Sequence, residues 1–239
     1  MKILDRTFGS PAENLACDEA LLDLCEKGLE GEILRFWESA ERFVVLGYSN
    51  KAETEINLEH CRQEKIPVLR RPSGGGTVLQ GPGCLNYALI LKIDGKYPLK
   101  TVTGANRFIM ERHREALSKL LGKEITVEGH TDLALGGVKF SGNAQRRKKN
   151  ALLFHGTFLI NFAIDEIKQF LPSPSQEPAY RAGRLHEKFL INLKIPAANV
   201  KKAITGIWEA SGRLERTPDQ EIADLAGRVY KQDDWNFRF

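Results

Sequence analysis

The feature that most constrains this chain is a run of three glycines, Gly74 to Gly76, between two apolar segments in "RRPSGGGTVLQGPGCLNYALI" (70–90). Glycine lacks a side chain, so such a run lets main-chain N–H groups point into one concavity that suits a phosphate or carboxylate oxygen. A tight turn with positive φ is the alternative explanation for the glycines alone. The run is neither a Walker A loop, because no Gly-Lys-Ser/Thr follows, nor a Rossmann fingerprint, because an expected strand follows it. We therefore ask whether it serves a nucleotide site of another design.

Around this run, the hydrophobic pattern predicts an α+β protein. A capping box at Ser10 and Glu13 predicts a helix to about Gly28, and an apolar stripe ending at Gly122 predicts another over 104–122. A second capping box, "TPDQ" (217–220), predicts the last long helix. Strands are expected at 31–38 and 42–49 as neighbours, and at 67–71, 84–93, 124–129, 132–145 and 151–162. This order favours a mixed, largely antiparallel sheet flanked by helices over a doubly wound parallel one.

Bulk properties exclude several classes of protein. The net charge of +4 is spread along the chain, and the only dense basic run, Arg146 to Lys149, is more typical of a solvated turn than of a nucleic-acid site, so we expect no nucleic-acid partner. Four cysteines without C-x-x-C spacing favour a reducing compartment. No window is apolar enough to cross a membrane, and the N-terminus has no cleavage site, so we expect a cytoplasmic protein without a membrane partner.

Two further segments carry chemistry. In "GGVKFSGNAQ", Lys139 lies between glycine pairs and small residues, where its ammonium can stabilise charge that develops on an anionic leaving group. A solvated lysine on a turn is the alternative. In "LFHGTFLIN", His155 lies within an apolar strand, where a hydrogen-bonded structural histidine is the usual explanation, while the adjacent Gly156 indicates close approach of another group.

Together, "RRPSGGGTVLQGPGCLNYALI", "DLALGGVKFSGNAQRRKKNALLFHGTFLIN" and the closing "WNFRF" resemble the catalytic domain of lipoate-protein ligases, in the biotin/lipoate ligase and octanoyltransferase superfamily. The resemblance covers most of the chain from the "ENLACDEALL" helix onwards. It implies a fold like that of biotin ligases and class II aminoacyl-tRNA synthetases. It also implies that residues 1–239 form a single catalytic domain, without the accessory C-terminal domain of many bacterial ligases, so that a separate accessory subunit is one option.

The resemblance implies an activity and partners. Such ligases activate lipoate or octanoate with ATP and Mg²⁺ to an acyl-adenylate. They then pass the acyl group to a lysine on a carrier, either the lipoyl domain of a 2-oxoacid dehydrogenase E2 subunit or the glycine-cleavage H protein.

The resemblance also implies roles for individual residues. Lys139 would be catalytic, on the carbonyl and phosphate oxygens of the acyl-adenylate. Asn86 would contact the nucleotide side, and Asp132 would contact adenine or magnesium. The remaining expected contacts are the cradle of Arg71, Ser73, Gly74, Gly75 and Gly76, the wall of Ser141, Gly142 and Ala144, and the border of His155, Gly156 and Thr157.

The same fold hosts octanoyl or lipoyl transferases that act through a cysteine thioester without ATP. Residues 129–162 contain no cysteine, and Cys84 between Gly83 and Leu85 is more typical of a core thiol than of a nucleophile. A transferase between carrier proteins, either dependent on Cys84 or independent of cysteine, is the alternative. A non-catalytic acyl-carrier binding module is the other alternative, although Lys139 and the glycines are all present. The sequence departs from the family at Gln80 and Gly81, where many members have His-Asp.

Overall fold

The computed structural model describes all residues from 1 to 239. The strands are β1 (Lys2–Asp5), β2 (Ile33–Trp37), β3 (Phe43–Leu46), β4 (Val68–Arg70), β5 (Val78–Gln80), β6 (Cys84–Lys92), β7 (Thr126–Glu128), β8 (Asp132–Leu135), β9 (Val138–Arg147), β10 (Ala151–Leu159) and β11 (Gly212–Arg213). The helices are α1 (Pro11–Glu26), α2 (Ala52–Glu55), α3 (Leu58–Gln63), α4 (Val102–Leu121), α5 (Ile167–Phe170), α6 (His186–Phe189), α7 (Ala197–Ile207), α8 (Asp219–Leu225) and α9 (Asp233–Asn236).

Eight strands form one large sheet in the order β11-β1-β2-β6-β10-β9-β8-β7, and β4-β3-β5 form a small one. Strand β1 pairs in parallel with β2 and β11, while all the other pairs of the large sheet are antiparallel. The predicted α+β class with a mixed, largely antiparallel sheet is therefore confirmed. The short strands β1, β5 and β11 are not apparent from the sequence pattern.

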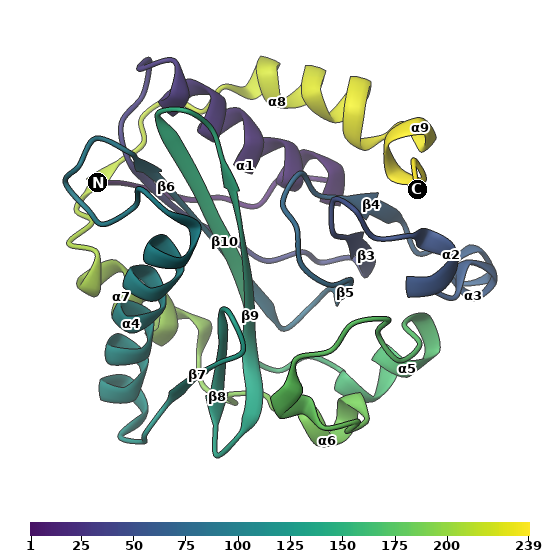
Figure 1. Cartoon of the computed structure of the whole chain (residues 1–239). Coiled ribbons are helices and arrows are strands. Elements are labelled where there is room, and N and C mark those ends of the chain that lie inside the picture. The colour runs from purple at the N-terminus through teal and green to yellow at the C-terminus, as the bar shows by residue number, and fades with distance from the viewer.

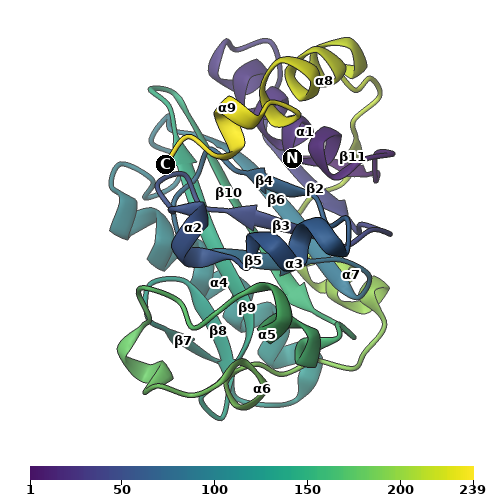
Figure 2. The same cartoon turned by 90° about the vertical axis from the view of Figure 1, so that its right-hand side faces the viewer.

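Helices and the small sheet cover the large sheet on its two faces. In Figure 1, α4 and α7 lie on one side of the large sheet, while α1, α8 and the small sheet lie on the other. One apolar cluster fills the α4 side around Leu89, Ile109 and Phe154. A second cluster lies under α1, and a third lies between the small sheet, the start of β6 and α5. Figure 2 shows the small sheet crossing in front of the long central strands.

The structure confirms most of the helix ends predicted from the sequence. At α1, Ser10 and Glu13 form the predicted capping box. Helix α4 ends at Gly122 with φ +60°, as expected for a C-terminal glycine cap, and begins two residues earlier than predicted because Thr101 accepts a hydrogen bond from Gly104 N–H. None of the helices is both long and apolar enough to cross a membrane.

Three local predictions are wrong. The segment 132–145, expected as one strand, forms β8 and β9, which pair antiparallel on either side of Gly136 and Gly137. The segments 31–38 and 42–49 do not pair, because β2 lies between β1 and β6 in the large sheet whereas β3 pairs with β4 and β5. The "TPDQ" segment forms no capping box, since α8 begins at Asp219 without a side-chain cap. The hydroxyl of Thr217 instead donates to Asp219, and Arg6 donates to both side chains.

Candidate active site

Antiparallel pairing aligns side chains in two rows across β2, β6, β10 and β9, on the face covered by α1 and the small sheet. The first row is Arg35, Ala88, His155 and Ala144; the second row is Trp37, Asn86, Thr157 and Gly142. Residues directly opposite each other on neighbouring antiparallel strands point to the same face, so each row is a line of adjacent side chains. These two rows form the floor of the candidate site.

The glycine loop, Ser73 to Thr77, links β4 to β5 above this floor. Its five backbone N–H groups donate to no acceptor in the protein. Its carbonyl groups point the other way, since the guanidinium of Arg71 donates to Gly74 O (2.7 Å) and Gly76 O (2.8 Å). Burial lowers the pKa of Arg71 to about 10, which leaves it charged near neutral pH. The loop therefore presents free amides to an anion, with a buried cation beneath them.

Two positions in this region require glycine. Gly75 has φ +89°, and a Cβ atom there would lie 3.8 Å from Cβ of Ala144, so the loop lies against the end of the first row. Gly47, just after β3, approaches the loop so closely that a Cβ atom would lie 2.0 Å from Gly75 O. Glycine is thus required by backbone conformation at Gly75 and by lack of space at Gly47.

A buried chain of polar groups starts from the loop. Oγ of Ser73 lies 2.6 Å from Nε2 of His155, and Nδ1 of His155 lies 3.4 Å from Oδ2 of Asp18 on α1. Asp18 is paired with the guanidinium of Arg35. A carboxylate can only accept, so Nδ1 of His155 donates to Asp18. The Ser73 hydroxyl accepts from Nε of Arg71 and shares a hydrogen bond with Nε2 of His155. Every member is buried and partnered, so this chain fixes Ser73 under the loop.

Lys139 reaches the same face through a β-bulge. Ser141 pairs with Leu133 and Lys139 with Ala134, which leaves Phe140 as an extra residue on β9. The side chain of Lys139 consequently lies on the site face, where a Cβ atom added to Gly142 would lie 2.7 Å from Nζ of Lys139. The glycine loop and the ammonium of Lys139 therefore converge at β9, as the sequence predicts.

Asp132 holds the ammonium of Lys139. Its Oδ1 lies 2.9 Å from Nζ of Lys139, and its Oδ2 accepts a hydrogen bond of 2.7 Å from the Tyr180 hydroxyl. Burial and the Asp132 carboxylate raise the pKa of Tyr180, so its hydroxyl stays a donor. Both carboxylate oxygens thus have partners, and Asp132 is placed to position Lys139.

Two expected wall residues face the other side of the sheet. Ser141 pairs with Phe158, and its hydroxyl is oriented to Asn143, whose Oδ1 accepts from the Tyr87 hydroxyl in the α4-side core. A Cβ atom on Gly156 would lie 1.8 Å from Oδ1 of Asn143, so the close approach predicted at Gly156 is made by this side chain. The expectation that Ser141 and Gly156 line the pocket is therefore corrected for their side chains.

The other expected residues lie in the two rows. Asn86 and Thr157 are central in the second row, where Oδ1 of Asn86 accepts from the Thr157 hydroxyl (2.6 Å). Through Thr157, Asn86 is connected to Gln80 of the small sheet, and its expected contact with the nucleotide side stays a prediction. Gly142, Ala144 and His155 lie on the floor of the candidate site, and their expected contacts with the acyl-adenylate stay predictions as well.

Sequence reasoning missed several residues of this region. Asp18, Arg35 and Trp37 lie on elements that the sequence predicts, but none of them was singled out. The only signal for Asp18 and Arg35 was a charged residue on an otherwise buried helix or strand, and Trp37 carried no signal. Gln80 was noticed only as a departure from the family pattern; its amide donates to the Thr157 hydroxyl (2.7 Å). Arg146, expected as a solvated turn residue, follows Ala144 on the site face, with its guanidinium 5.9 Å from the Tyr48 ring.

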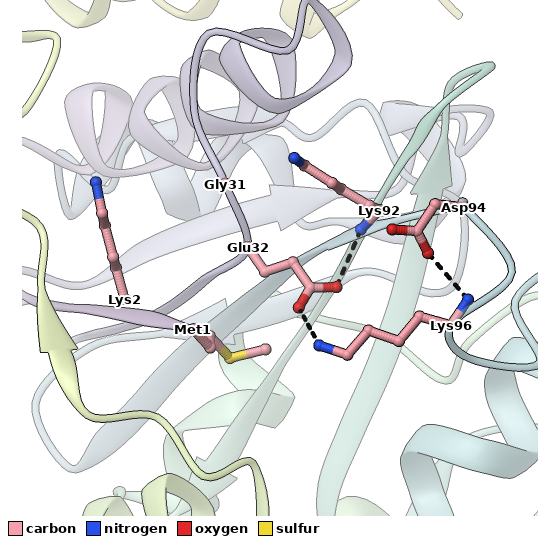
Figure 3. Close-up of a pocket in the computed structure, with 7 residues that line it drawn as sticks. All are labelled: Met1, Lys2, Gly31, Glu32, Lys92, Asp94 and Lys96. Carbon is pink, nitrogen blue, oxygen red and sulfur yellow. Dashed lines mark hydrogen bonds and ion pairs between the residues drawn. The ribbon is translucent and has the colours of Figure 1, made fainter.

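A separate hollow lies far from these residues, at the ends of β2 and β6. Figure 3 shows Glu32 accepting from the ammonium of Lys96 (3.2 Å) and from Lys92 N–H (3.4 Å). None of the predicted site residues lines this hollow.

Comparisons with known proteins identify the family of this chain. A family model described as the lipoyl protein ligase A/B catalytic domain matches residues 10–202. A protein of Aeropyrum pernix named "Putative lipoate-protein ligase A" is 35% identical over 93% of this chain and 80% of its own length. The octanoyltransferase LipM of Halalkalibacterium halodurans is 26% identical over 99% of this chain and 98% of its own.

Two solved structures have the same fold. A lipoate-protein ligase A bound with ATP superposes with a TM-score of 0.83 at 24% identity, covering 99% of this chain and 98% of that one. A bi-partite lipoate protein ligase of Thermoplasma acidophilum, described with its E2 lipoyl domain, has a TM-score of 0.82 at 22% identity, covering 99% and 95%. The chain therefore belongs to the lipoyl protein ligase A/B catalytic domain family.

Proposed function

We propose that this chain is an ATP-dependent lipoate-protein ligase, which converts lipoate or octanoate to an acyl-adenylate and transfers the acyl group to a lysine of a carrier domain. The observation that carries the proposal is the convergence of five free amides at Ser73 to Thr77 with the Lys139 ammonium on one face of β9. Free amides suit phosphate oxygens, and a fixed cation suits the bond between phosphate and acyl group.

The chemistry follows from the weakness of a carboxylate as an acyl donor. Its oxygen attacks the α-phosphorus of ATP, pyrophosphate leaves, and AMP becomes a good leaving group. The carrier amine then attacks the acyl carbon and expels AMP. In both steps negative charge develops on oxygens near Lys139, so one ammonium held by Asp132 serves both transition states.

Magnesium would enter with ATP, bound mainly by phosphate oxygens and water. The two oxygens of Asp132 accept from Lys139 and Tyr180, while the expected contact of Asp132 with adenine or magnesium stays a prediction. In the proposed reaction this residue positions the lysine.

The relatives leave a second candidate function, octanoyl transfer between carrier proteins, because LipM-type octanoyltransferases align over the whole chain. A thioester mechanism needs an accessible thiolate. All four cysteines are buried, and burial raises the pKa of both Cys17 and Cys84 to about 12. No thiol lies on the floor beside Lys139, which favours the ligase.

The ATP requirement separates the candidates. The purified chain is incubated with lipoate, magnesium and an apo lipoyl domain, with and without ATP, while pyrophosphate and the mass of the carrier are followed. We expect pyrophosphate release and a lipoylated carrier only with ATP. Acylation of the carrier from octanoyl carrier protein without ATP would instead assign the transferase activity. Binding without any acylation would assign a binding module.

A further inference from the structure

Arg70, the last residue of β4, is completely buried, and its guanidinium donates only to main-chain carbonyl groups. These carbonyl groups belong to two segments that are far apart in the chain, the turn that follows β3 (47–50, the β3 turn) and helix α9. The accepting atoms are Gly47 O (2.8 Å), Tyr48 O (3.0 Å), Asn50 O (2.8 Å), Trp235 O (3.2 Å) and Asn236 O (2.9 Å). One buried cation therefore joins the β3 turn to α9.

Helix α9 also forms hydrogen bonds with the main chain of Arg70. Strand β4 is an edge strand of the small sheet, and α9 packs against it (Figure 1). The N–H of Arg70 donates to Oδ1 of Asn236 (2.9 Å), and the carbonyl of Arg70 accepts from Nε1 of Trp235 (2.8 Å). Asn236 is itself held in place, since its Nδ2 donates to Tyr230 O (2.8 Å). Every polar group of Arg70 thus has a partner in α9 or in the β3 turn.

The β3 turn lies directly against the glycine loop. The N–H of Tyr48 donates to Ser73 O (2.9 Å), and Gly47 packs so closely on the loop that no Cβ atom would fit there. A continuous series of contacts therefore runs from α9 through Arg70 and the β3 turn to the glycine loop. Because Arg71 holds the carbonyl groups of the loop from beneath, the orientation of the five free amides depends on both arginines.

We propose that Arg70 and Trp235 are positioning residues for the nucleotide, because they tie α9 to the β3 turn and so hold the amides of the glycine loop in the orientation that binds phosphate oxygens. This inference rests on the proposed function, which supplies ATP as the ligand. Amides that are aligned in advance bind an anion without the cost of ordering the loop. Loss of the tie lets the loop take other orientations, so ATP binds more weakly while the fold persists.

The test is calorimetric titration of the full chain with ATP and magnesium, without an acyl substrate, alongside thermal unfolding. Arg70→Lys keeps the positive charge, but an ammonium lacks the planar fork with which a guanidinium reaches both segments. We expect this variant to bind ATP roughly tenfold more weakly, because several hydrogen bonds are lost together. Trp235→Phe keeps an aromatic ring and loses only the bond to Arg70 O, so it should bind ATP about threefold more weakly.

Arg147→Lys and Trp208→Phe are the matched controls, both on the α4 side of the large sheet. The guanidinium of Arg147 also donates to main-chain carbonyl groups, at Leu99 (2.6 Å) and Lys100 (3.3 Å). The indole N–H of Trp208 is buried and donates to His113 (3.0 Å). Each control should lower the unfolding temperature but leave the affinity for ATP within about twofold of the wild type, because it is distant from the loop.

Steady-state kinetics add a measurement that a purely structural role would not change. In the acylation assay, both test variants should show a raised KM for ATP, while kcat at saturating ATP should change little, because bound ATP restores the orientation of the loop. The two controls should show the KM of the wild type.

A folded Arg70→Lys protein with wild-type affinity for ATP would overturn the inference, as would an equal loss of affinity in Arg147→Lys. Should Arg70→Lys fail to fold, Trp235→Phe decides, and unchanged affinity in that variant has the same meaning. ATP-dependent acylation by the wild type, with unchanged affinity in the test variants, leaves the ligase intact and removes the positioning role. Weaker ATP binding in the test variants, without acylation by the wild type, retains the positioning role and removes the ligase. A wild type that bound no ATP would remove both.

Discussion

Two asparagines on the central strands show how the two faces of the large sheet differ. On the α4 side, Asn143 donates to Thr131 O and accepts from the Tyr87 hydroxyl, so both ends of its amide are paired. On the site side, Asn86 accepts from Thr157 and its nitrogen has no partner. Asn143 is structural, because the protein supplies hydrogen-bond partners for both ends of its amide. The amide nitrogen of Asn86 has no partner in the protein, so a ligand can supply one.

The largest effect on activity is expected from Lys139→Ala. In the proposed reaction the ammonium faces the oxygens that gain charge, so its loss should lower acyl transfer about a hundredfold or more, with little change in stability because the side chain is partly exposed. Lys149→Ala, in the exposed turn after β9, is the control. Near-normal turnover of a folded Lys139→Ala protein would remove the lysine from the mechanism.

The glycine loop is tested best at Gly76. Substitution of Gly75 strains the backbone at φ +89°, whereas Gly76 has no such φ, and a Cβ atom there would have no neighbour within 4 Å. Gly76→Ala should therefore fold normally and bind ATP about tenfold more weakly, because the new methyl group enters space that the ligand needs. Unchanged ATP affinity would show that the ligand does not approach the loop at this position.

Substitutions at two other glycines, one on each face of the large sheet, test directly how the two faces differ. Gly156→Ala places a methyl group against Oδ1 of Asn143 in the packed α4 side, and should reduce the free energy of unfolding by about 2 kcal/mol in urea titrations. Gly142→Ala meets only the flexible end of Lys139, so it should spare stability and reduce turnover. If both variants lost stability equally, the two faces would not differ as described.

The buried His113 on the α4 side of the large sheet should make the stability of the protein sensitive to acid. Burial lowers the pKa of His113 from 6.5 to about 3. His113 is therefore protonated below pH 6.5 in the unfolded chain, but only below about pH 3 in the folded protein. This contribution to stability is intact above pH 6.5 and falls by about 1.4 kcal/mol for each pH unit below it. Denaturant titrations of His113→Gln should show a shallower loss over pH 6.5 to 4 than the wild type; parallel curves would contradict this.

The smallest effect on activity is expected from Cys84→Ser. The thiol is buried among Leu79, Phe162 and other apolar side chains, and its raised pKa keeps it protonated. Turnover should remain within about twofold of the wild type, since a residue without a role in the transition state leaves kcat unchanged. A folded but inactive Cys84→Ser protein would reverse the choice between ligase and transferase.

The sequence predicted those parts of the site that depend on local chemistry. A triple glycine between two strands indicates a loop with free amides, and a lysine between glycines indicates a cation held close to a ligand. It did not predict Asp18 or Arg35, because their roles depend on α1 packing against β6 and β10 on the face that carries the first row. The pairing of β2 and β3 was also wrong, since two adjacent strands of similar composition do not reveal that they belong to different sheets.

By itself, the sequence determined the class of the fold, the helix ends at Ser10 and Gly122, and the identity of the groups that meet an anion, because capping and backbone freedom are properties of a few neighbouring residues. Only the tertiary structure decided which of those groups share a face. The bulge at Phe140 turns Lys139 to the side of Gly142, and cross-strand register joins Trp37 to Asn86. Register is set by contacts between segments distant in the chain, so no local pattern encodes it.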